Sequence, residues 1–190
     1  MTTPQKSWLR RQLARFAKSQ RGATAVEFAI VAGPFFYVLG CICETGLMLF
    51  TEYVIQNSVQ EAARIVRTGQ ASNGAGAIIL TQAEFKAELC GNVSIIIDCD
   101  GKVSIYVNNA DKFASLTAAM PDPLDVGPKA NGARYTTVYQ PGAELRTTTV
   151  IATYDWDFAF PFMDFLGNFG DGGKRRLYGL AIFRNEPFGT

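Results

Sequence analysis

The chain has 190 residues, of which 48% are hydrophobic, and a formal net charge of +1. That hydrophobic share is high for a purely soluble protein, so part of the apolar sequence is expected to lie in a membrane. The chain has no histidine, which removes the commonest general base and metal ligand at neutral pH, and no serine or cysteine stands in a nucleophile motif.

The small net charge conceals a strong asymmetry along the chain. Residues 1–22 contain six Lys and Arg and no acid, which leaves twelve basic against 17 acidic residues, a net charge of −5, for residues 23–190. A basic segment beside an apolar helix stays in the cytoplasm, and the sequence after the helix is exported. Nucleic-acid binding by the basic segment is the competing interpretation, but nothing later in the chain adds a basic face or an aromatic stacking platform. Residues 5–20 fit either a short amphipathic helix on the inner leaflet or a solvated leader.

An uncharged apolar run follows from Phe28 to Cys43, with Glu27 before it and Glu44 after it. In a helix the two carboxylates are about 26 Å apart, close to the roughly 30 Å of a hydrocarbon core, so both are able to sit near opposite interfaces. Pro34 lies inside the run and lacks the backbone donor of an ordinary helical residue, so a kink is expected there.

The helix is expected to continue past the membrane, from about Ala25 to Thr68. Apolar residues recur at helical spacing on one side, and polar residues fall on the other. The apolar stripe consists of Val54, Ile55, Val59, Ala62, Ala63 and Val66. The first half of the helix would then lie in lipid, and the second half would offer this stripe to a folded domain.

A second, short helix is predicted after a Gly-containing linker. Thr81 and Glu84 have the spacing of a capping box, and Cys90-Gly91 closes the helix. Two β-branched runs, Val93–Asp98 and Lys102–Val107, flank Asp100-Gly101 and predict a hairpin.

The four cysteines divide by location. Cys41 and Cys43 stand two positions apart in the apolar run, on nearly opposite sides of a helix, so they cannot pair with each other. Cys90 and Cys99 flank a predicted strand in the exported part, where an oxidising compartment would allow a disulfide. Two buried free thiols are the alternative.

The rest of the chain predicts an antiparallel sheet. Residues 108–142 contain four prolines and read as a long surface excursion. In Leu145–Phe160, successive side chains alternate between two faces so regularly that one buried and one solvated face are expected. Residues 168–173 predict a turn. The run Arg176–Phe183 predicts the last strand. The fold class is therefore α+β and pilin-like: a long N-terminal helix on a small antiparallel sheet of about four strands, with a short second helix.

The acidic residues of the exported part offer the one candidate for catalysis. Asp98, Asp100, Asp155 and Asp157 would be able to form a carboxylate pair across strands, although such residues are far more often the solvated face of a sheet. We therefore expect no enzymatic activity, no catalytic residue, no cofactor, no metal site and no small-molecule substrate.

Glu27 is the acid that requires an explanation. A carboxylate drawn to the bilayer centre costs about 2.5–3.5 kcal/mol, so Glu27 is expected to stay near the interface or to find a positive partner. A cut between Gly22 and Ala23 would create one, because it leaves an α-amino group one helical turn from Glu27. A neighbouring subunit would present the same amine, neutralising both charges and fixing the axial register. The alternative is a carboxylate that interacts with the dipole of its own helix N-terminus.

Several short motifs at the two ends of the chain resemble a known family. They are Ala23-Thr24-Ala25-Val26-Glu27-Phe28-Ala29, Glu44-Thr45-Gly46, Gln60-Glu61-Ala62-Ala63-Arg64 and Phe183-Arg184-Asn185-Glu186-Pro187-Phe188. The stretch from Gly22 to Phe28 resembles the processing site of type IVb pilins, and the four motifs together resemble the TadE-like pseudopilins of the tight-adherence (Tad) pilus system. The resemblance covers both ends of the chain, and residues 70–145 contribute little to it. The family glutamate is often followed by Tyr, where this chain has Phe28.

The resemblance implies a prepilin-peptidase substrate of the bacterial inner membrane. Such a protein acts as a minor subunit or assembly factor of adhesive pili, and its partners are other pilin or pseudopilin subunits and the pilus assembly machinery. The expected organisation is a cleaved cytoplasmic leader (1–22), a transmembrane part of the helix (23–50) and an exported, periplasmic part (51–190), with possible incorporation in the extracellular pilus.

Two other organisations compete with this one. A secreted binding domain behind an ordinary signal peptide is disfavoured, because Glu27 interrupts the apolar region and the helix continues past it. An uncleaved, signal-anchored membrane protein with a periplasmic binding domain is the main alternative, and the state of the N-terminus distinguishes it.

Overall fold

The structure is a computed structural model, and it describes residues 22–91, 93, 97–128, 137–168 and 173–188. The chain forms two compact units, the first ending at Cys43 and the second running from Glu44 to the C-terminus. Except for Gly22, the expected basic leader lies outside the described residues, as does most of the turn expected at 168–173.

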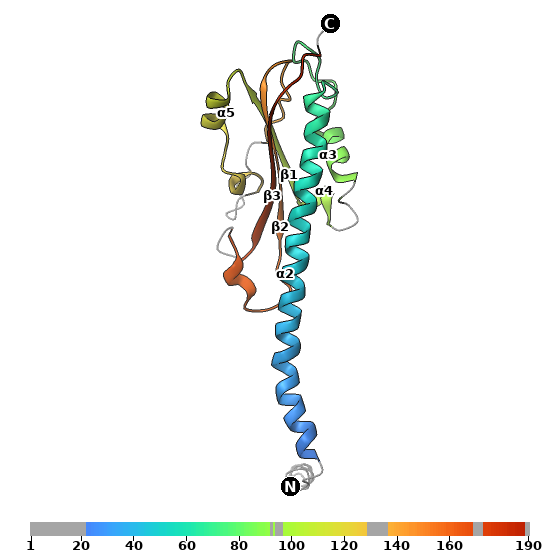
Figure 1. Cartoon of the computed structure of the whole chain (residues 1–190), viewed down its shortest axis with the longest axis vertical. Coiled ribbons are helices and arrows are strands. Elements are labelled where there is room, and N and C mark those ends of the chain that lie inside the picture. Colours follow the sequence, from blue (N-terminus) through green and yellow to red (C-terminus); the bar gives the residue numbers. More distant parts are fainter. Residues whose placement is uncertain (1–21, 92, 94–96, 129–136, 169–172, 189–190) are drawn as a thin grey trace, which may run out of the picture. The chain divides into compact units, whose positions relative to one another are not determined.

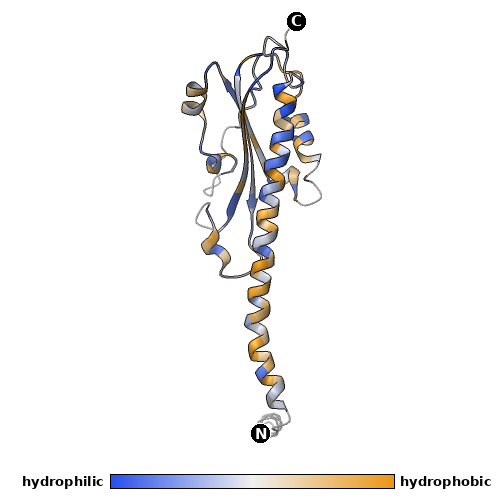
Figure 2. Cartoon of the chain, viewed as in Figure 1, coloured by the Kyte–Doolittle hydropathy of each residue, from blue (hydrophilic) through white to orange (hydrophobic). Residues whose placement is uncertain are grey.

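One helix, α2 (Ala23–Arg67), contributes to both units. It has 45 residues and continues through Pro34, which confirms the long N-terminal helix expected from the spacing. Among the described residues, α2 is the one helix long and apolar enough to cross a membrane, with a mean hydropathy of 2.0 over its most apolar 18 residues. Figure 2 shows the corresponding succession of hydrophobic residues along it.

The second unit contains a three-stranded antiparallel sheet in the order β1-β2-β3. Its strands are β1 (Val103–Ala110), β2 (Thr147–Trp156) and β3 (Arg175–Arg184). Trp156 pairs with Arg175, and Thr147 pairs with both Ala110 and Arg184. The sheet thus has a Trp156 end and a Thr147 end, about 30 Å apart along β2 at 3.4 Å per residue.

The residues of α2 from Glu44 onward pack on one face of this sheet (Figure 1). The predicted apolar stripe supplies most of the contact, since Ile55, Val59 and Val66 are buried in one core with strand residues such as Val150 and Leu177. This confirms the expectation that the second half of the helix packs on the folded domain.

The opposite face of the sheet is also covered, which the alternation in β2 did not predict. Two short helices, α5 (Phe113–Ala119) and the 3₁₀ helix η2 (Pro123–Asp125), lie over it, and Ile151 of β2 packs there with Tyr106 and Val126. The expectation of one solvated face was therefore wrong, and much of the expected surface excursion is the cover of that face.

Buried Arg176 on β3 secures this cover. Its guanidinium forms two hydrogen bonds with the Asp155 carboxylate, at 2.6 and 2.8 Å. It also donates to the carbonyls of Leu124, Val126 and Pro128. A buried cation is stable only where its donors are satisfied, so Arg176 ties the segment after η2 to the sheet.

The short helix α3 (Gln82–Gly91) forms as the capping box predicts. The backbone N–H of Thr81 donates to the Glu84 carboxylate at 2.8 Å, and that of Glu84 donates to the Thr81 hydroxyl at 3.3 Å. The hydrogen bond that the Thr81 hydroxyl donates to the Glu84 carboxylate, followed by the one from the Thr81 N–H, lowers the pKa of Glu84.

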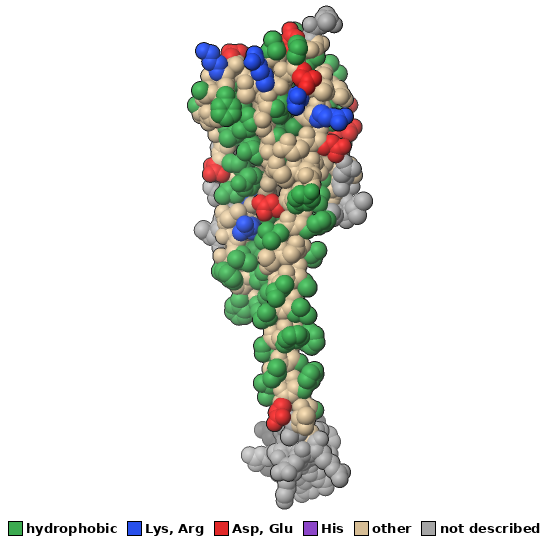
Figure 3. All heavy atoms as spheres, in the orientation of Figure 1, with side chains coloured by type: hydrophobic (Ala, Val, Ile, Leu, Met, Phe, Trp, Pro, Cys, Tyr) green, Lys and Arg blue, Asp and Glu red, His purple; other side chains and the backbone are tan. Residues whose placement is uncertain are grey.

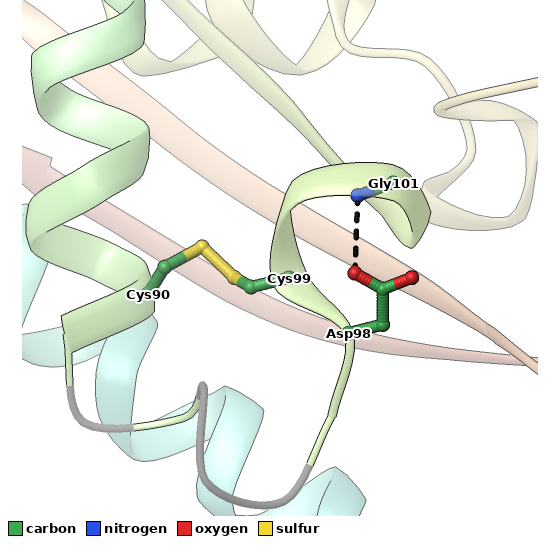
Figure 4. Close-up of a disulfide and its surroundings, with 4 residues drawn as sticks. All are labelled: Cys90, Asp98, Cys99 and Gly101. Carbon is green, nitrogen blue, oxygen red and sulfur yellow. Dashed lines mark hydrogen bonds between the residues drawn. A yellow bond between two sulfur atoms is a disulfide. The ribbon is translucent and has the colours of Figure 1, made fainter.

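The predicted hairpin around Asp100-Gly101 was wrong. These residues lie in a one-turn helix, α4 (Cys99–Lys102), because the Asp98 side chain accepts from the Gly101 N–H at its start (Figure 4). Lys102 ends α4, and β1 begins at Val103. The described part of the chain therefore has three strands in its sheet, where about four were expected.

Candidate functional site

The residues of the expected processing site stand at the start of α2. Gly22 immediately precedes the helix and is exposed, and the helix begins at Ala23. A Cβ built on Gly22 would meet no atom within 4 Å. The fold therefore leaves room for a side chain at Gly22, and a requirement for glycine there would have to come from something that acts on the chain.

Glu27 is exposed and surrounded by exposed apolar side chains. Its neighbours Phe28, Ile30 and Val31 each leave about two thirds or more of their surface uncovered. Among the described residues, no side chain forms an ion pair with Glu27 within 4.0 Å. Ala23 is four residues earlier, one turn of the helix, so an amine at Ala23 would lie on the same side of α2.

The first unit exposes an apolar surface along α2. Large hydrophobic side chains are exposed along α2 in this unit, including those of Phe35, Phe36, Val38 and Ile42. Figure 3 shows hydrophobic side chains along the helix on the face it presents. An exposed apolar surface of this extent marks a membrane or protein contact.

Glu44, at the other end of the apolar run, has a different environment from Glu27. It is buried, with 6% of its surface exposed. Its carboxylate accepts two backbone hydrogen bonds from the segment after β2, from the Ala159 N–H at 2.6 Å and from the Phe160 N–H at 3.2 Å. Hydrogen bonds to a charged acceptor are the stronger kind. Glu44 therefore joins the first helical turn of the second unit to the Trp156 end of the sheet.

Sequence reasoning used Glu44 only as the charged residue that follows the apolar run, and it missed this role. Its partners lie 115 and 116 residues away, and backbone amides carry no sequence signature. The available signal was a second carboxylate, within an otherwise apolar stretch, that stands in a motif resembling the family.

The closing motif, Phe183–Phe188, lies against the C-terminal end of α2 in the second unit. The N–H of Glu186 donates to the carbonyl of Arg67 at 2.9 Å, and their side chains form an ion pair at 2.9 Å. Gly69 has a φ of +78°, and the Phe188 ring occupies the place of a Cβ there. The closing segment that resembles the family thus holds the C-terminal end of α2.

The candidate carboxylate pair has other partners. Asp98 caps α4, Asp155 binds Arg176, and Asp157 lies between Lys102 at 3.3 Å and Lys174 at 2.7 Å. The hydrogen bond from Lys174 is the main reason that the pKa of Asp157 is lowered. The side chain of Asp100 is outside the described part of the chain. Within that part, no group of three or more His, Cys, Asp or Glu is placed to hold a metal ion.

The structure joins Cys90 and Cys99 in a disulfide, with Cα atoms 5.9 Å apart (Figure 4). The bond connects the end of α3 to the start of α4. Cys41 and Cys43 are free cysteines on α2.

Comparison with known proteins bears on the N-terminal helix. Residues 22–64 match the model of the family described as TadE-like protein. No curated protein and no solved structure matched the chain. The match begins at Gly22, covers Glu27 and Glu44, and ends at the last residue of the Gln60–Arg64 motif. It therefore confirms the resemblance for the N-terminal helix: over residues 22–64 the chain is similar to TadE-like proteins.

Proposed function

We propose that the chain is a minor pilin or pseudopilin required for the assembly of Tad-type (type IVb) adhesive pili. The family suggests a protein associated with the Tad pilus. In this proposal prepilin peptidase cuts between Gly22 and Ala23 in the inner membrane, and the mature subunit assembles with other pilin subunits through α2. The exported domain has a structural role and no catalytic one.

The observation that carries the proposal is the position of Glu27. It is an exposed carboxylate without an ion-pair partner in the described chain, on a helix with exposed apolar side chains, one turn from the residue that cleavage would make the N-terminus. In a low-dielectric bundle such a charge is costly unless it is paired. The amine of a neighbouring subunit would provide the pair.

Two features of the second unit support an exported location. The Cys90–Cys99 disulfide requires an oxidising compartment. The basic leader precedes α2 in the order that keeps the N-terminus in the cytoplasm and sends the following domain to the periplasm.

Processing is tested by co-expressing the full chain with the prepilin peptidase of a Tad system and determining the N-terminus by mass spectrometry. We expect a mature chain that starts at Ala23. Gly22→Val should block the cut, and Gly33→Val is the matched control, because a Cβ at either glycine meets no atom within 4 Å. An intact leader would favour the uncleaved, signal-anchored alternative, and a cut beyond residue 40 would favour an ordinary signal peptide.

Assembly is tested with Glu27→Gln, which removes the charge and changes little volume. The variant should insert in the membrane and be cleaved, but pilus production or incorporation of the subunit should fall. Glu52→Gln, which changes another glutamate of α2, should behave like the unmodified chain. Unchanged pili in the Glu27→Gln strain would contradict the proposed pairing.

A further inference from the structure

Two phenylalanines, one just before η3 (Met163–Leu166) and one within it, are the most exposed large hydrophobic residues that the structure describes. Phe162 leaves 83% of its surface uncovered and Phe165 leaves 80%. Between them Met163 is buried, with 4% exposed. The segment thus packs on the second unit through Met163 and presents an aromatic ring on either side of it.

The backbone at Phe162 is held in an unfavourable conformation. Its φ of 66° places it in the left-handed region, where a bulky side chain is a genuine outlier. Such strain persists only where the surroundings enforce it, and it gathers at functional positions. A glycine would relieve the strain here, and because Phe162 is so exposed, burial of its ring in the unit does not explain the phenylalanine.

The segment is fixed at several points. The Gly167 N–H donates to the Asp164 carbonyl at 2.9 Å, and the Arg175 guanidinium donates to the Leu166 carbonyl at 3.0 Å. On the other side, the Ala159 and Phe160 amides are bound by Glu44. The rings of Phe162 and Phe165 are therefore displayed by a well-supported turn.

The position of this turn is set by Glu44. The turn follows β2 at the Trp156 end of the sheet, and Glu44 is the residue immediately after the apolar run that ends at Cys43. Wherever that run leaves a bilayer, Glu44 and the turn bound to it must lie close by. Leu47 and Phe50, on the next turns of α2, are also exposed and belong to the same end of the second unit.

We propose that Phe162 and Phe165 insert into the interfacial region of the membrane leaflet from which the second unit emerges, with phospholipid as the partner. Phenylalanine side chains on a membrane-facing surface bury their rings at the boundary between the headgroups and the acyl chains, as those of interfacial helices do. The contact would give the exported unit a second attachment besides α2 and restrict its rotation above the membrane. The inference rests on the proposed membrane location of α2.

The experiment uses the full chain in phospholipid vesicles with brominated acyl chains, which quench tryptophan fluorescence on contact. The two native tryptophans, Trp8 and Trp156, are first replaced by phenylalanine, and the buried Trp156 Nε1 has no hydrogen-bond partner to lose. Single reporters are then introduced as Phe162→Trp and Phe165→Trp.

Two further reporters serve as controls. Phe36→Trp lies in the apolar run and tests whether α2 is in the membrane. Phe113→Trp is the matched exposed position, with 59% of its surface uncovered. It stands on α5, which follows β1 at the Thr147 end of the sheet.

We expect bromolipid to quench Phe162→Trp and Phe165→Trp as well as Phe36→Trp, and to leave Phe113→Trp unaffected. Quenching of Phe36→Trp alone would overturn the inference and leave the proposed function standing. An unquenched Phe36→Trp would count against both. Equal quenching of Phe113→Trp would mean general adsorption of the unit, and a blue-shifted but unquenched Phe162→Trp would mean contact with another protein copy; either result overturns the inference.

Discussion

Gln56 of α2 and Leu180 of β3 form the two hydrogen bonds that a neighbouring strand would otherwise supply. The Gln56 side-chain amide accepts from the Leu180 N–H at 2.9 Å and donates to its carbonyl at 3.0 Å. Likewise, the Asn168 side-chain amide accepts from the Arg176 N–H at 2.7 Å and donates to the Arg176 carbonyl at 3.2 Å. Side chains thus occupy backbone groups on the outer edge of β3, which protects an edge strand from pairing with another chain.

Replacing Gln56 by leucine should weaken the attachment of α2 to the sheet. The change leaves the Leu180 N–H without its acceptor, and an unsatisfied polar group of this kind costs about 1–3 kcal/mol. Thermal unfolding in detergent, followed by circular dichroism, should show a lower midpoint. Gln60→Leu should have a smaller effect, because Gln60 makes only a longer bond of 3.3 Å to the Leu180 carbonyl. Equal midpoints for both variants would contradict this account.

Gly179 should not tolerate even alanine. A Cβ there would lie 2.9 Å from Val59 Cγ2 and 3.0 Å from the Ile55 carbonyl oxygen, so α2 would have to move off the sheet. Overpacking of this kind costs about 1–3 kcal/mol, which a lower free energy of unfolding would report. Gly91→Ala is the control, because a Cβ at Gly91 meets no atom within 4 Å. A neutral Gly179→Ala would show that α2 packs less closely than described.

Removing the Glu44 carboxylate should release the segment after β2. In Glu44→Ala the Ala159 and Phe160 amides lose their acceptor, and hydrogen bonds to a charged group contribute about 1.5–3 kcal/mol each. Hydrogen exchange at these two amides should accelerate, and chymotrypsin should cut faster at Phe162 and Phe165. Glu52→Ala, on the same helix, should change neither rate. Unchanged protection in Glu44→Ala would exclude the proposed anchoring role.

Reducing the Cys90–Cys99 disulfide should destabilise the second unit. The bond closes a loop with a sequence separation of 9, and constraining a short loop in the unfolded chain contributes about 2–3 kcal/mol. A reductant should lower the unfolding midpoint of the unmodified chain and should not affect Cys90→Ser/Cys99→Ser. The Cys41→Ser/Cys43→Ser variant should keep the full response to reductant, since these cysteines are free.

The ion pairs of Asp157 predict a pH dependence. Its pKa is lowered from 3.8, chiefly by the hydrogen bond from Lys174, so its contribution to stability is present above that value and is lost as the pH falls through the lowered pKa. The pKa of Lys102 is raised from 10.5, chiefly by Asp157, so that contribution is lost only as the pH rises through the raised pKa.

Asp157→Asn should therefore be less stable than the unmodified chain near pH 7. The difference should stay below about 1 kcal/mol, because both lysines are half exposed and water screens the pairs. It should shrink with added salt and vanish at acid pH, when Asp157 is protonated in both states. A difference in unfolding midpoint that persists unchanged at low pH would show that the effect does not come from charge.

The features predicted correctly from the sequence are those that depend on local spacing. The apolar stripe with Ile55 and Val59 predicted a helix that continues past Glu44, and the spacing of Thr81 and Glu84 predicted the start of α3. Both patterns determine a backbone conformation through neighbours three or four residues away.

The features that were missed depend on distant partners. The threonines of β2 read as a solvated face, but Thr153 is buried and its hydroxyl donates to the Val126 carbonyl at 3.0 Å. Asp100-Gly101 read as a turn, but the Asp98 cap makes it helical. The anchoring of Glu44 depends on amides more than a hundred residues away, and no local pattern indicates it.

Because α2 packs against β3, folding of the second unit cannot be completed before β3 has been synthesised. α2 is synthesised well before β3, because Gln56 and Leu180 are separated by 124 residues. The buried side of α2 therefore lacks its final cover until β3 has been made, and contacts of such long range form slowly. A chain that lacks β3 would leave Ile55 and Val59 exposed, so this strand decides whether the second unit reaches its folded form.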